Sequence, residues 1–488
     1  MKKGTIKQRL FLTLAVTLLI TGASAQNSQV LYFMNLPQNH LLNPALRPTN
    51  TIYVGLPALT GINLNVRNNF LNFSDVFAEG MKIDESTIPF LREDFDADRF
   101  ISRLRDLNYL EQSTSIQVLG LGFSAGQDKD LYLFLDITEH INASMVFPRD
   151  LMKLAFMGNK DLENQTFDLS DMRADMSYYR EIGIGASKNI NQKLRVGATA
   201  RLLFGLATAS FQNYAMDLTV NEDGTNTLDA NMALDFSGPV RFFLDSENHI
   251  ENVEFADEQF DSSKGVTNFL TNARNAGFGL DLGAEYAVND QLTLSAAITD
   301  VGFIKWKSDL SNLEAYGNVE LNGLDFGDVR ENSATFDDVT NSLIDSLKNA
   351  FIFANVEKRF TTKLPVGFTV GGKFDLNDKF SIGLLSYTRV NGVQLKEALT
   401  LSANMNLANS LYTTLAYTAA NNSYTNLGLG LGFRASVFQL YFLFDKIPLS
   451  WKRAGTSGES VTLPANWHTL HARFGMNLVF GNKQGRRM

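Results

Sequence analysis

The stretch KLPVGFTVGGKFDLNDKFSIGL, residues 363–384, decides the fold. Apolar side chains alternate with polar or small ones on both sides of Asn377-Asp378. Successive side chains of a strand point to opposite faces, so each half predicts a strand with one apolar and one polar face. The apolar face of the first half holds Leu364, Val366, Phe368, Val370 and Phe374. The whole stretch predicts an antiparallel hairpin turned at Asn377-Asp378.

The same rhythm recurs along the chain. Alternating segments occupy 182–186, 194–202, 278–286, 292–298, 399–407, 427–433, 438–444 and 472–480. A further hairpin, about 115–125 and 130–140, has an alternation that slips between Val118 and Leu119. With a first strand near 51–67, the total is about fourteen. Many of these strands reach about ten residues, the length that a tilted strand needs to cross a bilayer.

Connection lengths give a second signal. Tight turns are expected at about 126–129, 189–192, 288–290, 376–378, 406–409 and 435–436. They alternate with connections that are often much longer, which is typical of outer-membrane barrels. The sequence therefore predicts an all-β fold, a transmembrane antiparallel β-barrel of about 14 strands. The alternative is a soluble β-sandwich with one solvated face, which also alternates.

The first residues predict export. Lys2, Lys3, Lys7 and Arg9 precede a short apolar run that ends in Ala23-Ser24-Ala25, a small-residue cleavage site. We therefore expect a cleaved signal peptide at 1–25, an N-terminal plug or hatch segment at 26–50, and the barrel at 51–488. No stretch of eighteen uninterrupted apolar residues follows, so strands must make any membrane span. The expected location is the outer membrane of a Gram-negative bacterium.

Composition and motifs argue against several functions. The formal net charge of −9 disfavours nucleic acid as a partner, and the absence of cysteine excludes disulfides and thiolate chemistry. His468 and His471 are three apart, which on a strand places them on opposite faces. The run Asp94, Asp96, Asp98 lacks the glycine and the glutamate of a calcium loop. We expect no catalytic site, no metal and no cofactor.

Several long connections predict additional structure. Amphipathic spacing indicates short helices near 96–104, at Arg149–Met157 and from Asp337 to Asn355, which would cap the barrel or pack inside it. Residues 204–276 are long enough to hold extra strands that project outside.

Charged residues on the polar strand faces are candidates for the lumen lining. They are Arg195, Arg201, Asp281, Glu285, Arg434, Asp445 and Arg473. Their mixed signs favour a network that holds a plug over a selectivity filter. Gly428, Gly430, Gly432 and Gly475 leave the wall shallow, with room for an inserted segment. Residues 26–50 contain Pro37, Pro44 and Pro48 and fit an ordered coil in a polar lumen.

A family resemblance rests on particular motifs. The segment from Asn35 through Asn43-Pro44-Ala45 to Pro57, with Phe147-Pro148-Arg149-Asp150-Leu151 and Gly158-Asn159, closely resembles a Bacteroidota outer-membrane family of undetermined function. The similarity covers nearly all of the mature chain. More distantly, Asn-Pro-Ala after a short N-terminal coil looks like the FadL group of hydrophobic-compound transporters and like PorV-type and PorP-type barrels. The resemblance implies that Asn43, Pro44 and Ala45 form a hatch, while the long helical insertions depart from FadL.

The functional expectation is a non-enzymatic barrel that passes or binds small, hydrophobic molecules and contacts outer-membrane lipid. The alternative is a non-transporting interaction protein whose loops at 69–113, 204–276 and 305–362 hold a secretion or surface partner. A membrane-embedded hydrolase ranks last, because no Ser, His and acid share one strand face.

Overall fold

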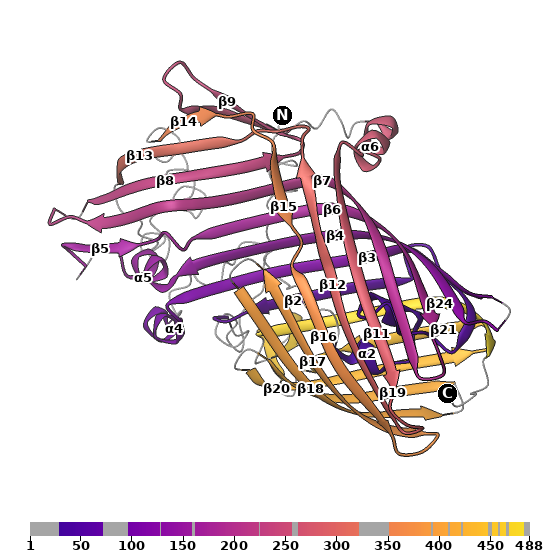
Figure 1. The fold of residues 1–488 in the computed structure, drawn as a ribbon. Helices are drawn as coiled ribbons and strands as arrows, with labels where there is room; N and C mark the ends of the chain where they lie inside the picture. The colour runs from indigo at the N-terminus through magenta and orange to yellow at the C-terminus, as the bar shows by residue number, and fades with distance from the viewer. Residues whose placement is uncertain are drawn as a thin grey trace.

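The computed structural model describes residues 29–71, 96–126, 128–158, 162–223, 225–255, 262–321, 351–391, 394–407, 410–420, 423–447, 451–456, 459–464 and 468–482. Over these residues the chain forms a closed antiparallel barrel of fourteen strands (Figure 1). The first position is shared by β1 (Asn50–Gly55) and β2 (Gly61–Asn68), and both pair with the second strand and with the last. This closure confirms the predicted barrel and excludes the sandwich. The predicted signal peptide lies outside the described residues.

The remaining barrel strands follow chain order. They are β3 (Leu107–Ala125), β4 (Leu131–Pro148), β6 (Arg173–Asn189), β7 (Leu194–Val220), β11 (Asn275–Ala287), β12 (Leu292–Trp306), β16 (Val366–Asp375), β17 (Phe380–Asn391), β18 (Gln394–Leu407), β19 (Leu411–Ala420), β20 (Ser423–Ala435), β21 (Phe438–Phe444) and β24 (Thr469–Asn482). The short β15 (Phe360–Lys363) pairs with the far end of β12.

The two strand faces differ as the alternation predicts. Val370 and Leu401 are 62% and 58% exposed on the outer surface. Their neighbours Thr369 and Thr400, which face inward, are 1% and 0% exposed. Apolar side chains therefore face the lipid, and polar ones face an interior that is filled.

The two ends of the barrel also differ. All six predicted turns join consecutive barrel strands at one end, where β1 begins and β24 ends. We call this the tight-turn end. The connections around 69–106, 149–172, 221–274 and 307–365 lie at the opposite, long-connection end. In outer-membrane barrels the short turns face the periplasm and the long loops face outward.

Two irregularities of the wall bear on the predictions from the sequence. The alternation slip near Val118 is confirmed, because the pairing of β3 with β4 shifts register between Gln117 and Leu119. The single first strand predicted at 51–67 is in fact interrupted between β1 and β2. Pro57 has no N–H to donate, and Ala58 adopts a φ of 61°. Leu59 remains 49% exposed, whereas Thr60 is fully buried and its carbonyl accepts hydrogen bonds from Gln38 and Tyr441.

The barrel sheet itself continues into an extension at the long-connection end (Figure 1). The far half of β7 pairs with β5 (Gln165–Asp168) and β8 (Asn226–Ser237), and β8 continues to β13 (Leu313–Leu321) and β14 (Ile352–Asn355). Its core includes Leu218, Val220 and Phe351. Separate hairpins are formed by β9 (Val240–Leu244) with β10 (Ile250–Phe255), and by β22 (Trp451–Thr456) with β23 (Glu459–Pro464). The extra strands predicted within 204–276 are therefore present.

Helices are short. The predicted helices near 96–104 and at Arg149–Met157 are confirmed as α4 (Ala97–Arg103) and α5 (Arg149–Met157), which pack together through Phe100 and Phe156. The others are α2 (Gln29–Phe33), the 3-10 helix η1 (Pro37–Leu41) and α6 (Ser263–Leu270). No helix in the described ranges has the length and apolar character needed to cross a membrane.

The helix predicted from Asp337 to Asn355 is wrong at its end. Ile352–Asn355 forms strand β14, because its backbone pairs with Leu313–Tyr316 and its Phe353 is buried in the core of the extension. Residues 337–350 lie outside the described ranges.

Candidate functional site in the barrel lumen

Residues 29–49 lie inside the barrel, and we call them the plug segment. Its helix α2 contacts β17, β18, β19, β20 and β21. On another part of the wall, Asn43 and Pro44 meet β7 and β11. Only a segment within the lumen can touch strands so far apart around the barrel. Figure 1 shows α2 enclosed by the strands.

Glycines of the wall make room for α2. A Cβ placed on Gly430 would lie 2.7 Å from Val30 Cγ1 and 2.8 Å from Met34 Sδ, closer than side-chain atoms tolerate. Gly428 faces Val30 at a similar distance, and a Cβ on Gly432 would lie 3.3 Å from the terminal methyl group of Met34. These three glycines thus form the predicted shallow wall. The fourth, Gly475, faces the carbonyl of Thr60 instead.

An apolar cluster fills the contact between α2 and this wall. The plug segment contributes Val30, Leu31, Tyr32, Phe33, Met34, Leu36 and Leu42, and the wall contributes Leu385, Tyr412, Ala416, Tyr441 and Leu443. Every member is at most 9% exposed. This part of the lumen is therefore lined by apolar groups rather than by the polar ones of a water-filled pore.

Asp445 holds the first residue of α2. Its carboxylate accepts hydrogen bonds from the backbone N–H groups of Gln29, at 3.2 Å, and Val30, at 2.9 Å. The same carboxylate lies 2.9 Å from Nδ1 of His471, whose Nε2 lies 2.7 Å from Oδ1 of Asn63. The predicted lumen residue Asp445 therefore contacts the plug segment directly. A carboxylate at a helix N-terminus satisfies unpaired donors and is attracted by the helix dipole.

A histidine anchors the middle of the plug segment. His40 Nε2 lies 2.6 Å from Oδ2 of Asp136 on β4, and Nδ1 lies 2.6 Å from the carbonyl of Pro37. A carbonyl can only accept, so Nδ1 donates to Pro37 and Nε2 faces the carboxylate. Tyr53 donates its hydroxyl to the other Asp136 oxygen at 3.2 Å, and Gln117 donates to it as well. Both side chains are buried, so water does not compete for this contact.

The predicted hatch tripeptide lies against the wall formed by β7, β11 and β12. Asn43 donates to the carbonyls of Ala284 and Ala296, both at 3.3 Å, and its Oδ1 accepts from the N–H of Ala45 at 2.9 Å. Pro44 occupies the space above Gly197, where any Cβ would meet its carbonyl group. Asn43 and Ala45 are both fully buried.

Arg201 organises the charges on that side of the wall. Its guanidinium contacts Glu181 at 2.8 Å, Asp281 at 2.5 Å and Asp300 at 3.1 Å. His140 Nε2 lies 3.2 Å from Glu181. Arg201, Glu181 and Asp281 are at most 6% exposed. These partners belong to β4, β6, β11 and β12, so the network joins wall strands to one another.

The other predicted lumen residues are dispersed. Arg195 pairs with Glu285 at 2.9 Å. Arg434 donates to Oδ1 of Asn50 at 3.1 Å, at the tight-turn end where the barrel begins. Arg473 is 4% exposed and lies beside Tyr441. The structure thus brings together Arg201 with Asp281 and Arg195 with Glu285, but does not gather all seven residues into one site.

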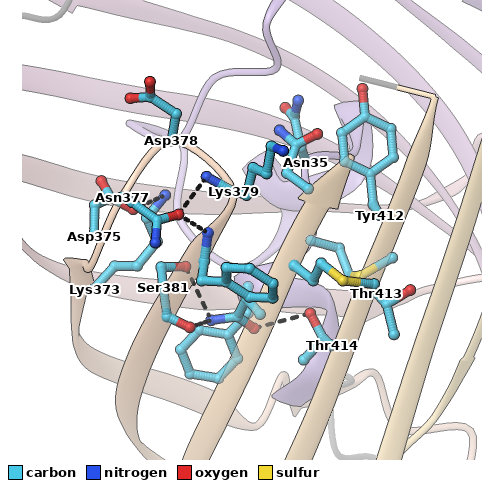
Figure 2. A pocket seen from close by; sticks show the side chains of 16 residues that line it. Asn35, Lys373, Asp375, Asn377, Asp378, Lys379, Ser381, Tyr412, Thr413 and Thr414 are labelled. Atoms are coloured by element: carbon cyan, nitrogen blue, oxygen red, sulfur yellow. Dashed lines mark hydrogen bonds and ion pairs between the residues drawn. The ribbon is translucent and has the colours of Figure 1, made fainter. Parts of the chain in front are cut away.

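A small polar cavity lies where the plug segment meets the tight-turn end (Figure 2). Its volume is about 110 Å³. The lining includes Asn35, Lys373, Asp375, Lys379 and Tyr412. A water occupies roughly 30 Å³, so a few waters fit, whereas ligand pockets usually span about 300–1,000 Å³. This cavity is therefore too small to hold a larger solute.

Sequence reasoning missed several contacts of the lumen. His40, Asp136, Glu181 and Asp300 were not singled out from the pattern. A signal was present at Asp136, which is a carboxylate among apolar residues of a strand and shares its inward face with Tyr132 and Phe134. Across the described residues, no group of three His, Asp or Glu side chains is placed to hold a metal ion.

Comparison with known protein families shows which family the chain belongs to. The sequence pattern of a family of unknown function, DUF5723, matches residues 44–445. The chain belongs to that family. A comparison with the curated proteins finds no match. The predicted Bacteroidota origin and the likeness to PorV-type and PorP-type barrels stay predictions.

Solved structures similar to this DUF5723 member are outer-membrane barrels. The toluene transporter TbuX of Ralstonia pickettii is 10% identical, with 91% of this chain and 94% of that chain covered at a TM-score of 0.40. A FadL homologue of Pseudomonas aeruginosa is 10% identical, with 94% and 99% covered at 0.39. The toluene transporter TodX of P. putida is 11% identical, with 95% and 96% covered at 0.38.

Proposed function

We propose that the protein is an outer-membrane channel for small apolar molecules, closed by its own plug segment. The observation that carries the proposal is the apolar cluster between α2 and the wall. When α2 leaves its seat, Leu385, Tyr441 and Leu443 lose their cover. Exposed apolar surface is unfavourable in water and is stabilised by an apolar occupant. A small apolar molecule is therefore the solute that this route favours.

The contacts of the plug segment suit a movable closure. Asp445, Asp136 and the carbonyls of Ala284 and Ala296 hold it through hydrogen bonds. Water can replace each of these bonds, at a net free energy of roughly 0.5–3 kcal/mol apiece. The barrel itself is held by continuous ladders that do not involve residues 29–49. The plug segment can therefore leave without unfolding the wall.

A reversible lock tests the proposal. The natural chain has no cysteine, so V30C/G430C creates a single pair across the seat of α2. Replacing Val30 also removes the methyl group that a new Cβ at position 430 would meet. The matched control is A403C/L415C, a cross-strand pair of the outer wall face. Liposome swelling or uptake of a small aromatic hydrocarbon is measured for each variant and for a deletion of residues 29–49.

The expected outcome is specific. The oxidised V30C/G430C protein blocks flux and a thiol reductant restores it, while the control pair has no effect in either state. The deletion variant conducts permanently. Equal flux through the oxidised lock, the control and the wild-type protein would refute the proposal.

A second candidate, docking of a protein partner at the cell surface, is favoured by the extension. This sheet has a hydrophobic core of its own, which closing the lumen does not require. Tyr214 and Tyr316 lie on nearby strands and are 62% and 58% exposed. Exposed tyrosines are enriched at protein interfaces. Y214S/Y316S would abolish capture of such a partner from outer-membrane extracts while leaving flux unchanged, whereas a channel without a partner would capture nothing in either form.

A further inference from the structure

The outer surface of the barrel carries a hollow that the lumen does not explain. It lies over β11, β12 and β15, has a volume of about 470 Å³, and is lined by Phe278, Val301, Gly302, Phe303, Lys305, Thr361 and Lys363. Phe278, Val301 and Phe303 are 45%, 42% and 36% exposed. These are lipid-facing side chains, so the hollow opens toward the membrane and not toward the lumen.

Two lysines stand at one edge of this hollow. Register pairs Phe303 with Lys363 and Lys305 with Thr361, so the lysines are diagonal neighbours on adjacent strands. Cα atoms at such positions are about 7–8 Å apart. The Lys305 ammonium also lies 5.3 Å from the centre of the Phe303 ring. Within the described residues, neither lysine forms an ion pair with a carboxylate.

The depth of the hollow matches the level of lipid headgroups. Leu294 is the first strongly exposed apolar residue of β12, counting from the tight-turn end, and Lys305 follows eleven residues later. A bulge between Ile298 and Val301 takes up one residue, so at about 3.3 Å per residue and a tilt of about 40° the separation along the membrane normal is roughly 25 Å. The hydrocarbon core is about 30 Å thick, so the lysines reach the headgroups of the leaflet at the long-connection end.

Basic residues continue above the hollow. Arg274 on the approach to β11 and Lys307 after β12 are both exposed. We infer that this surface binds a phosphate-bearing membrane lipid of the outer leaflet. The ammonium groups of Lys305 and Lys363 contact the phosphate, and an acyl chain lies on Phe278, Val301 and Phe303. Charge and apolar surface are both complementary to such a lipid, whereas free phosphate would use the lysines alone. This site does not depend on the proposed channel.

Binding is tested with the full chain in detergent. Native mass spectrometry counts bound molecules of a synthetic acylated disaccharide bisphosphate and of the same lipid without phosphates, with inorganic phosphate as a third probe. The test variant is K305Q/K363Q. The matched control is K193Q/K379Q, two exposed lysines beside turns of the tight-turn end. K305R/K363R keeps the charge.

The wild-type protein should bind one bisphosphate lipid and prefer it to the phosphate-free form. Each lysine near an anionic lipid contributes roughly a fivefold factor, so K305Q/K363Q should weaken binding about 25-fold. K193Q/K379Q and K305R/K363R should keep affinity near the wild-type value. Equal affinity of K305Q/K363Q and the wild type, indifference to the lipid phosphates, or equally tight binding of inorganic phosphate would overturn the inference.

Discussion

The plug segment meets two different walls inside one barrel. On the side of β16–β21, α2 packs its apolar side chains onto glycines and onto Leu385 and Leu443. On the side of β4–β12, η1 and the hatch tripeptide form hydrogen bonds with Asp136 and with backbone carbonyls. The first wall binds α2 through complementary shape, and the second wall binds η1 and the hatch tripeptide through hydrogen-bond acceptors. We expect damage to the first to displace α2 and damage to the second to release η1.

Loss of Arg201 should have the largest effect, and it should act on the barrel and not on the plug segment. R201M leaves Glu181 and Asp281 buried, and Asp300 half-buried, without their shared cation. Breaking such a network by removing one partner destabilises a protein by about 3–5 kcal/mol. The measurement is urea unfolding in detergent micelles. R195M is the control, and it should lose less stability because the ion pair of Arg195 with Glu285 is less deeply buried than those of Arg201 with Glu181 and Asp281. An equal loss of stability in R201M and R195M would show that the network around Arg201 stabilises the barrel no more than the pair of Arg195 and Glu285 does.

Replacing Asp136 should have the second-largest effect, and it should act on the plug segment and not on the barrel. D136N keeps the shape but removes the charge that His40, Tyr53 and Gln117 face. A hydrogen bond to a charged group is worth about 1.5–3 kcal/mol. Amide hydrogen exchange of residues 38–41 should accelerate by roughly ten- to hundredfold. T138V changes the next inward residue of β4 and should leave that exchange unchanged. Equal amide exchange rates in D136N and T138V would show that the Asp136 carboxylate does not hold His40 in place.

The features of the fold that could be predicted from the sequence are the local ones. Strand alternation is a local property, so residues such as Thr369 and Val370 revealed their faces without any tertiary information. The tight turns and the slip at Val118 were local as well. The fourteen-stranded barrel could therefore be predicted, including its closure.

The contacts of the lumen could be predicted only in part. The pair His40 and Asp136 lies 96 residues apart, and Gln29 with Asp445 lies 416 apart. No spacing rule connects such residues, because their meeting depends on how the plug segment winds inside the barrel. Glycines at alternate positions, 428, 430 and 432, did indicate a shallow wall. Strand β14 was missed because a short amphipathic stretch fits either period.

Gly430 and Gly432 allow a test of whether the shape of the wall holds α2 in place. In G430A the new Cβ meets Val30 and the sulfur of Met34 below 3.0 Å, whereas in G432A it lies 3.3 Å from the terminal methyl of Met34, which can move. Overpacking typically destabilises by about 1–3 kcal/mol. G430A should therefore raise the flux of small solutes by roughly tenfold or more, and G432A should leave it near the wild-type value. Equal flux in both variants would show that α2 tolerates a shallower seat.

The smallest effect is expected at Asp445, because asparagine caps a helix nearly as well as aspartate. D445N keeps one oxygen, which can accept from Val30, but it loses the second oxygen, which accepts from Gln29, and the attraction of the charge for the helix dipole and for His471. That attraction is worth about 0.3–1 kcal/mol. Amide exchange at Val30 should quicken by roughly two- to fivefold, less than in D136N. An effect as large as that of D136N would mean that charge holds α2 as firmly as it holds η1, and the two walls would then differ in shape but not in the kind of interaction they use.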